Sequence, residues 1–168
     1  SDEDRARSAR KGYDDKRTRR RALTYDGWSN DQVRELIDVL APRCRGWFVT
    51  ITDHLLAPIW SDALENVGRY VFQPLPFVEI GKQPRLTGDG PASWSCWIVV
   101  SRPKNREFAS WGSLPGAYCT RKKNQKDRHV GGKPLWLMEA LIRDYTRPGD
   151  LVCDPCAGYG TTLAAAIR

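Results

Sequence analysis

A glycine-rich turn between a predicted strand and a predicted helix constrains the fold more than any other feature of the sequence. The apolar run at 151–154 leads into the string DPCAGYGTT at 154–162, and a helical pattern begins at Thr161. In open α/β sheets, ligands bind where such a strand ends and the next helix begins. Gly158 and Gly160 permit a tight turn and a close backbone approach, although a glycine pair alone more often marks only a turn. A P-loop is excluded because the Lys is missing, and a dinucleotide fingerprint because the third Gly is missing.

The rest of the sequence alternates between helical and strand patterns. Ser29 and Gln32 have the spacing of a capping box, and apolar residues then recur at helical intervals to about Ala41. Pro74 and Pro76 interrupt one strand and predict an edge position or a bulge there. This order predicts an α/β sheet covered by helices on both faces, with the second and third strands as an antiparallel pair. The predicted strands lie at 46–52, 69–80, 94–100 and 151–154, and the predicted helices at 29–41, 59–67, 134–145 and from 161 onward.

The composition is that of one globular domain. The chain has 168 residues and a formal net charge of +7. No apolar run approaches the roughly 18 residues that would span a bilayer, and the first residues lack the apolar core of a secretion signal. The five cysteines are scattered and odd in number, which argues for reduced thiols and against a disulfide framework. We therefore expect a cytoplasmic protein that makes no contact with a membrane.

Positive charge is concentrated in two segments. Residues 1–21 hold nine Lys and Arg against five Asp and Glu, and residues 101–133 hold nine against two. These segments carry +4 and +7, so the rest of the chain carries −4 within the total of +7. Both segments lack apolar periodicity, which predicts basic loops at 1–27 and 101–133. They are either solvated surface loops or, because their basic residues are clustered, a footprint for phosphates.

Two smaller constellations carry weaker signals. Cys153 and Cys156 form a CxxC pair, but neither a second such pair nor a His pair completes a tetrahedral site, so we expect no bound metal. A structural role is favoured for both cysteines, with Cys153 pointing from a buried strand. Asp53 and His54 follow a predicted strand without any nucleophile motif, and catalysis by this pair is the weaker hypothesis.

The string at 154–162 resembles the S-adenosylmethionine-binding motif of the amino-methylating DNA methyltransferases, which act on N6 of adenine or N4 of cytosine. Cys156 stands where Phe is common in that motif, and Tyr159 where Ser is common. The run from His129 to Pro134 resembles the HxxxKP element that precedes the helix leading into the motif. The resemblance covers residues 124–168 most closely and is of the phage type further upstream. It implies that S-adenosylmethionine is the cofactor, bound by Asp154, Pro155, Cys156, Ala157, Gly158, Gly160, Thr161, Thr162, Lys133 and Pro134.

The catalytic element of that family is not found in this sequence. It consists of Asp, Asn or Ser followed by Pro-Pro and an aromatic residue, and it holds the exocyclic amine of a base flipped out of the duplex. In the permuted motif order, which places the cofactor motif last, this element comes first. We therefore expect it upstream of Ser1, and an acidic ribose-binding residue downstream of Arg168. The catalytic residues are unknown, and the chain is expected to be cut at both ends.

The resemblance implies one methyltransferase domain over 1–168, with a three-layer αβα, Rossmann-like fold in the permuted motif order. It implies a site-specific DNA methyltransferase of a restriction-modification system or a phage, which acts on double-stranded DNA in a prokaryotic or phage-infected cell. It also allows a homodimer. An inactive DNA-binding or partner subunit and an RNA methyltransferase remain alternatives. Trp111 and Tyr118 are candidates for contacts with the target strand. The residues expected to bind DNA are Arg17, Arg19, Arg20, Arg21, Arg121, Lys122, Lys123 and Lys126.

Overall fold

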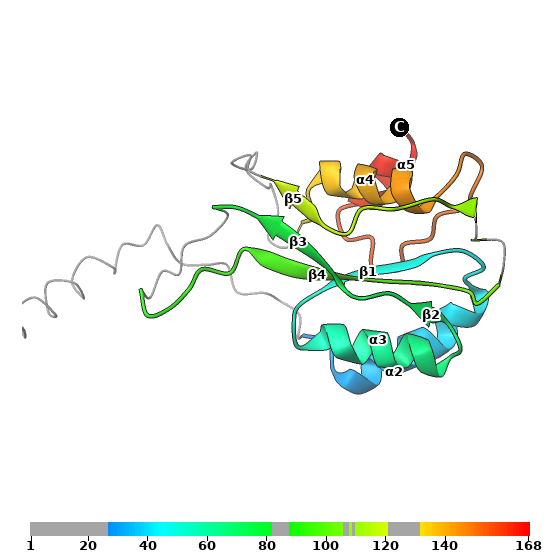
Figure 1. Cartoon of the computed structure of the whole chain (residues 1–168), viewed down its shortest axis with the longest axis horizontal. Coiled ribbons are helices and arrows are strands. Elements are labelled where there is room, and N and C mark those ends of the chain that lie inside the picture. The colour runs from blue at the N-terminus through cyan, green and yellow to red at the C-terminus, as the bar shows by residue number, and fades with distance from the viewer. Residues whose placement is uncertain (1–26, 82–87, 106–107, 109, 121–131) are drawn as a thin grey trace, which may run out of the picture.

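The computed structural model describes residues 27–81, 88–105, 108, 110–120 and 132–168. Their elements are α2 (Asn30–Leu40), the 3-10 turn η2 (Ala41–Arg43), β1 (Phe48–Thr52), α3 (Leu56–Asn66), β2 (Tyr70–Val71), β3 (Leu75–Glu79), β4 (Ser95–Arg102), β5 (Tyr118–Thr120), α4 (Leu135–Tyr145) and α5 (Thr161–Ala166). The sheet lies between α2 and α3 on one face and α4 and α5 on the other (Figure 1). The predicted sheet with helices on both faces is confirmed.

β4 is the central strand of this sheet. It pairs antiparallel with β1 on one side and with β2 and β3 on the other, and β3 pairs parallel with β5. The predicted antiparallel pair of the second and third strands is therefore confirmed. β1, β3 and β5 run in one direction, so their carboxyl ends, at Thr52, Glu79 and Thr120, lie at the same end of the sheet.

Alternate residues of β4 belong to two separate hydrophobic cores. Val99 is buried with Trp60 in the core that α2 and α3 cover. Ile98 and Val100 are buried with Leu141 in the core that α4 covers. Because successive side chains of a strand point to opposite faces, one strand can supply both cores.

The first described helix begins where its capping box predicts. The Ser29 hydroxyl accepts a hydrogen bond from the Gln32 amide at 3.2 Å, and the Gln32 side chain accepts one from the Ser29 amide at 2.9 Å. The backbone N–H groups of Ser29 and Gln32, which have no hydrogen-bond partner within the helix, are thereby satisfied. Val33 and Ile37, one turn apart, are fully buried. The predicted start and apolar face of this helix are confirmed.

The strand that the prolines interrupt is broken into β2 and β3. Val71 lies opposite Ser101, and Leu75 lies opposite Ile98, so four steps along one strand face three along its partner. One extra residue opposite a continuous partner strand is the mark of a β-bulge. The predicted bulge is therefore confirmed.

The strand predicted at 151–154 is not formed. These residues have no regular secondary structure, and Leu151 is 97% exposed. A strand needs hydrogen-bonded neighbours, and none of the strands within the described ranges pairs with this segment. The expected burial of Cys153 is wrong for the same reason, since its side chain is exposed.

The prediction of one basic loop over 101–133 is also wrong in part. Ser101 and Arg102 complete β4, and Tyr118 begins the short strand β5. A strand of three residues is too short to produce a visible alternation of apolar and polar residues. Residues 121–131 of this predicted loop lie outside the described residues, as do residues 1–26 of the other predicted basic loop.

Asp53 is part of a helix start. Its carboxylate accepts hydrogen bonds from the amides of Leu55 and Leu56, each at 2.9 Å, and α3 begins at Leu56, before the predicted start. The weaker hypothesis of catalysis by Asp53 and His54 gains no support, because the Asp53 carboxylate already has this capping role. None of the helices in the described part of the chain is both long and apolar enough to cross a membrane.

Candidate functional site

The Asp154 side chain organises the glycine-rich turn. One carboxylate oxygen, Oδ1, accepts a hydrogen bond from the Cys156 amide at 2.9 Å. The other, Oδ2, accepts one from the Thr162 hydroxyl in the first turn of α5. The same side chain therefore joins the beginning of the turn to the helix that follows it. Three residues predicted to bind the cofactor are brought together in this way.

Both glycines of the turn have backbone angles that favour glycine. Gly158 has φ of +51° and Gly160 has φ of +73°, in the left-handed region. Gly160 precedes α5, donates its amide to the Ala157 carbonyl at 2.7 Å and accepts the Ala164 amide at 2.9 Å. A left-handed residue with a Cβ costs about 1–2 kcal/mol. The tight turn predicted from the sequence is therefore present.

The turn offers room for a ligand. A Cβ placed on Gly160 would meet nothing within 4 Å, and residues 155–159 are exposed. The pKa of the Cys156 thiol is raised, first by partial burial of the sulfur and second by the nearby Asp154 carboxylate. The thiol therefore stays protonated and neutral near pH 7. An open backbone surface with a neutral thiol and hydroxyls beside it fits an uncrowded approach by S-adenosylmethionine.

Lys133 and Pro134 lie at the start of the neighbouring helix. Pro134 is buried at the N-cap of α4, and Lys133 is exposed. α4 packs against α5, and the Arg168 guanidinium forms a 2.8 Å ion pair with Glu139 between the two segments. The two predicted cofactor elements thus belong to one layer of the fold. His129 lies outside the described residues.

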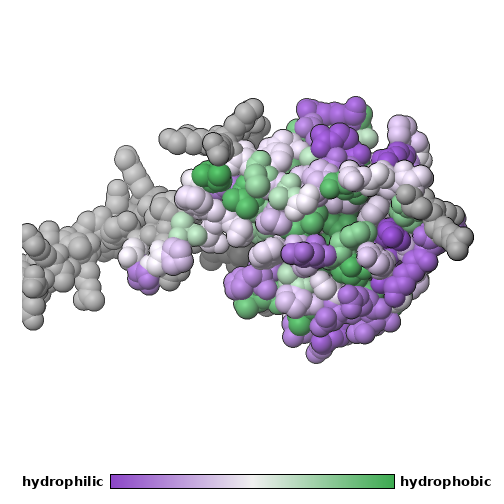
Figure 2. Space-filling model, viewed as in Figure 1, coloured by the Kyte–Doolittle hydropathy of each residue, from purple (hydrophilic) through white to green (hydrophobic). Residues whose placement is uncertain are grey.

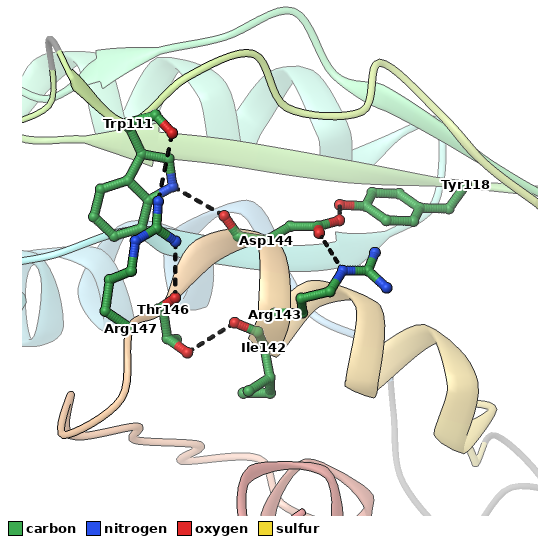
Figure 3. Close-up of polar contacts among 7 residues, drawn as sticks. All are labelled: Trp111, Tyr118, Ile142, Arg143, Asp144, Thr146 and Arg147. Atoms are coloured by element: carbon green, nitrogen blue, oxygen red, sulfur yellow. Dashed lines mark hydrogen bonds and ion pairs between the residues drawn. The ribbon is translucent and has the colours of Figure 1, made fainter.

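Figure 3 shows the contacts at the opposite end of α4, around Asp144. The Tyr118 hydroxyl donates to its Oδ2 and the Arg143 Nε to its Oδ1, each at 2.8 Å. The Trp111 indole donates to its backbone carbonyl at 3.0 Å. Burial and the bond to Asp144 raise the pKa of Tyr118 far above that of a free tyrosine. Tyr118 is 5% exposed, so it is unavailable to a flipped base, contrary to the expectation of a contact with the target strand.

Arg69 forms a second buried polar cluster. It donates to the carbonyls of Cys44, at 2.9 Å, and Gly46, and its Nε donates to the Ser101 hydroxyl at 3.0 Å. Arg69 is 5% exposed, and burial lowers the pKa of its guanidinium. The side chain joins the segment before β1 to β4.

Sequence reasoning missed both Asp144 and Arg69. Asp144 gave one available signal, because it falls on the apolar stripe of its helix, three residues after Leu141 and next to the buried Tyr145. A charge on that stripe indicates a buried hydrogen-bond partner. Arg69 gave no comparable signal, since two of its partners are backbone carbonyls that any residue supplies and the third, the Ser101 hydroxyl, is 32 residues away.

The residues predicted to bind DNA are not part of the contacts described above. All eight residues expected to bind DNA lie at 1–26 or 121–131, which are not described. Within the described ranges no group of three or more His, Cys, Asp or Glu side chains is arranged to hold a metal ion. Cys153 and Cys156 are both free thiols.

A sequence model of the N6/N4 DNA methylase family matches residues 9–168. The chain belongs to this DNA methylase family. A similar solved structure, the complex of M1.HpyAVI with S-adenosylmethionine, has a TM-score of 0.66 and 26% identity, covering 79% of this chain and 69% of that one. TTHA0409 of Thermus thermophilus has a TM-score of 0.54 and 21% identity, covering 82% of this chain and 65% of that one. The predicted fold of the S-adenosylmethionine-dependent DNA methyltransferases is confirmed by these similarities.

One curated relative is the Type II methyltransferase M.BglI of Bacillus subtilis. It is 38% identical over 71 residues, which are 41% of this chain and 20% of M.BglI. The chain thus matches about a fifth of the length of that methyltransferase.

Proposed function

We propose that the protein carrying this chain transfers a methyl group from S-adenosylmethionine to an exocyclic amine of a DNA base, either N6 of adenine or N4 of cytosine. The observation that carries the proposal is the turn that Asp154 organises, in a chain of the N6/N4 DNA methylase family. The similarity to M.BglI supports a role beside a restriction enzyme.

The residues of the turn would bind and orient the cofactor. S-adenosylmethionine supplies an activated methyl group on a positively charged sulfur. Gly158 and Gly160 leave the backbone open to it, while Asp154 fixes the turn through the Cys156 amide and the Thr162 hydroxyl. Because both oxygens of Asp154 already accept hydrogen bonds, its main role would be to hold the shape of the turn. Holding the methyl group in line with an amine contributes much of the rate enhancement in such transfers.

Lys133 and Pro134 would border the cofactor from the start of α4. Pro134 is buried and fixes the entry into the helix, whereas the exposed Lys133 is available to a polar group of a ligand. The remaining members of the cofactor set, Pro155, Ala157 and Thr161, would contribute through the shape of the turn. The group that accepts hydrogen bonds from the target amine would lie elsewhere in the protein.

Double-stranded DNA is the proposed substrate, and its phosphates would be held by the basic residues at 1–27 and 121–126. Clustered Arg and Lys favour such contacts through counterion release. A cytoplasmic location and a homodimer belong to the same proposal. The absence of a Pro-Pro-aromatic element from residues 1–168 favours one alternative, an inactive DNA-binding subunit.

The test is methyl transfer by the full-length protein. The protein is incubated with methyl-labelled S-adenosylmethionine and unmethylated duplex DNA, which is then digested to nucleosides. We expect label in N6-methyladenine or N4-methylcytosine, its loss in Asp154→Ala, and its retention in the control Asp38→Ala on the exposed face of α2. Cofactor binding without labelled DNA would contradict the proposal, and labelled RNA in a parallel reaction would identify the other substrate.

A further inference from the structure

A strip of alternating rings and cations lies at the end of the sheet where β4 finishes. It consists of Tyr70, Arg102, Phe108, Trp111 and Arg147. The Arg102 guanidinium lies 4.7 Å from the ring centre of Tyr70 and 5.6 Å from that of Phe108. The Phe108 and Trp111 ring centres are 5.7 Å apart, and the Arg147 guanidinium lies 3.8 Å over the Trp111 ring. The five side chains thus form one continuous row.

The row rests on Trp47, a partly buried ring of the core under α4. The Trp47 ring packs edge-on against Phe108 at 5.2 Å and Trp111 at 5.6 Å, and against Tyr145 at 5.3 Å. Rings held in this way lose little freedom when a ligand binds over them. The outer members remain accessible, since Tyr70 is 46% exposed and Arg147 is exposed.

The described residues use only some of the donors on the two guanidinium groups. Arg102 donates to the Pro103 carbonyl. Arg147 donates to the carbonyls of Thr146 and Trp111, as Figure 3 shows. Neither forms an ion pair with a carboxylate of the described residues. A guanidinium has five N–H donors, so the described residues leave at least three unused on each. Two positive charges therefore face the surface without compensation from the described carboxylates.

The strip lies at the opposite end of α4 from Lys133 and Pro134. Tyr70 begins β2 and Arg102 ends β4, opposite the end marked by Thr52 and Glu79. Lys133 precedes the far end of α4, an 11-residue helix that spans about 16 Å. Hydrophilic side chains gather near β2 on the face drawn in Figure 2.

We propose that this strip binds the phosphate backbone of DNA, at a surface separate from Lys133 and Pro134. The planar fork of Arg matches the oxygens of a phosphate, and stacking on a ring fixes that fork in advance. The exposed ring of Tyr70 adds a surface on which a nucleotide can stack. The exposed Lys104, two residues after Arg102, adds another positive charge. The proposal rests on the proposed function for the identity of the partner as DNA, while the strip shares no residue with the predicted cofactor set.

The test is the salt dependence of DNA binding by the full-length protein. Affinity for a non-specific duplex is measured by fluorescence anisotropy between 50 and 200 mM salt, for the wild type and for Arg102→Gln/Arg147→Gln. Each lost phosphate contact lowers the slope of log affinity against log salt by about 0.9, so the wild type should lose about tenfold more affinity than the variant over this range. The charge-matched control is Arg34→Gln/Arg168→Gln, whose arginines pair with Asp31 and Glu139 and lie outside the strip.

Three further measurements separate the outcomes. Arg102→Lys/Arg147→Lys keeps the charge and should restore most of the slope, whereas restoration of melting temperature alone would indicate a purely structural strip. Arg102→Gln alone is measured as well. Arg102 makes one hydrogen bond to the described residues, so this variant should fold normally. An unchanged slope in this variant overturns the proposal. Methylation of a short duplex at saturating concentration should stay unchanged. If no protein methylates DNA but the slope is still reduced in Arg102→Gln/Arg147→Gln, the proposed function is overturned. The assignment of the strip as a DNA-binding surface then stands.

Discussion

Tyr118 and Asp144 join the short strand β5 to the last turn of α4 through a hydrogen bond of 2.8 Å between two buried side chains. The bond fixes the end of the helix whose start carries Lys133 and Pro134. A buried carboxylate depends on such donors, because an unpaired charge in the protein interior is costly. The orientation of α4 therefore depends on a polar contact as well as on its apolar face.

Removal of the Tyr118 hydroxyl should destabilise the protein. We expect Tyr118→Phe to lower the free energy of unfolding by about 1–3 kcal/mol, because Asp144 loses a buried donor. Urea denaturation measures this change. Tyr70→Phe is the control, since that hydroxyl belongs to an exposed side chain, and it should change stability by less than about 0.5 kcal/mol.

The same hydroxyl predicts a loss of stability at high pH. The pKa of Tyr118 is raised in the folded protein, whereas an unfolded tyrosine titrates near pH 10. Above about pH 10 the unfolded chain releases this proton and the folded protein retains it, so stability should fall by about 1.4 kcal/mol per pH unit. Urea denaturation from pH 8 to 11 should show a shallower decline in Tyr118→Phe. Equal slopes in the two proteins would contradict the assignment.

Two substitutions of Asp154 distinguish shape from charge in the turn. Asp154→Ala removes both hydrogen bonds and should weaken cofactor binding by the full-length protein at least about tenfold, the equivalent of one charge-assisted hydrogen bond. Asp154→Asn can still accept from the Cys156 amide and donate to the Thr162 hydroxyl, so its loss should be about threefold or less. Titration calorimetry measures both. An Asn variant as weak as the Ala variant would mean that the charge itself acts on the ligand.

Gly160→Ala tests the left-handed turn before α5. The φ of +73° should cost about 1–2 kcal/mol with alanine, or a fall in Tm of about 2–8 °C. Gly46→Ala is the matched control, because Gly46 has no positive φ and an added Cβ there also meets nothing within 4 Å. Differential scanning calorimetry compares the two variants, and equal Tm values would argue against strain at Gly160.

Arg69→Met should be among the most destabilising substitutions in the described core. It leaves the Cys44 and Gly46 carbonyls without their buried donor, at a cost of about 2–4 kcal/mol. Arg45→Met removes the same charge from an exposed position and should cost less than about 0.5 kcal/mol. Guanidinium denaturation compares the two, and similar midpoints would show that the Arg69 contacts add little.

Local patterns in the sequence predict the elements that depend on local contacts. The capping box of Ser29 and the turn at Gly158 and Gly160 agree with the structure, because each depends on residues close together in the chain. The bulge near Pro74 was predictable because prolines disrupt strand pairing whatever the partner strand is. The strand expected at 151–154 failed because pairing depends on partners far away in the sequence.

The candidate site divides in the same way. The hydrogen bonds of Asp154 join residues within the nine-residue motif at 154–162, so the motif itself predicts which side chains meet. Arg69 bonds to Ser101 and Tyr118 to Asp144, over 32 and 26 residues, and no short motif records such pairs. Trp111 looked available to a base, but its ring is occupied by Arg147 and Trp47, which are also distant in sequence.

The position of β4 between two cores has a consequence for local opening of the protein. Its residues pair with β1, β2 and β3, and its two faces contribute to both cores, so separating it from any partner exposes apolar side chains on both sides. Partial opening that spares one core is thus unfavourable, and the sheet should open as a unit. In deuterium exchange, the amides of Ile98, Val99 and Val100 should exchange last, at a rate set by global unfolding, while those of α5 exchange through local fraying.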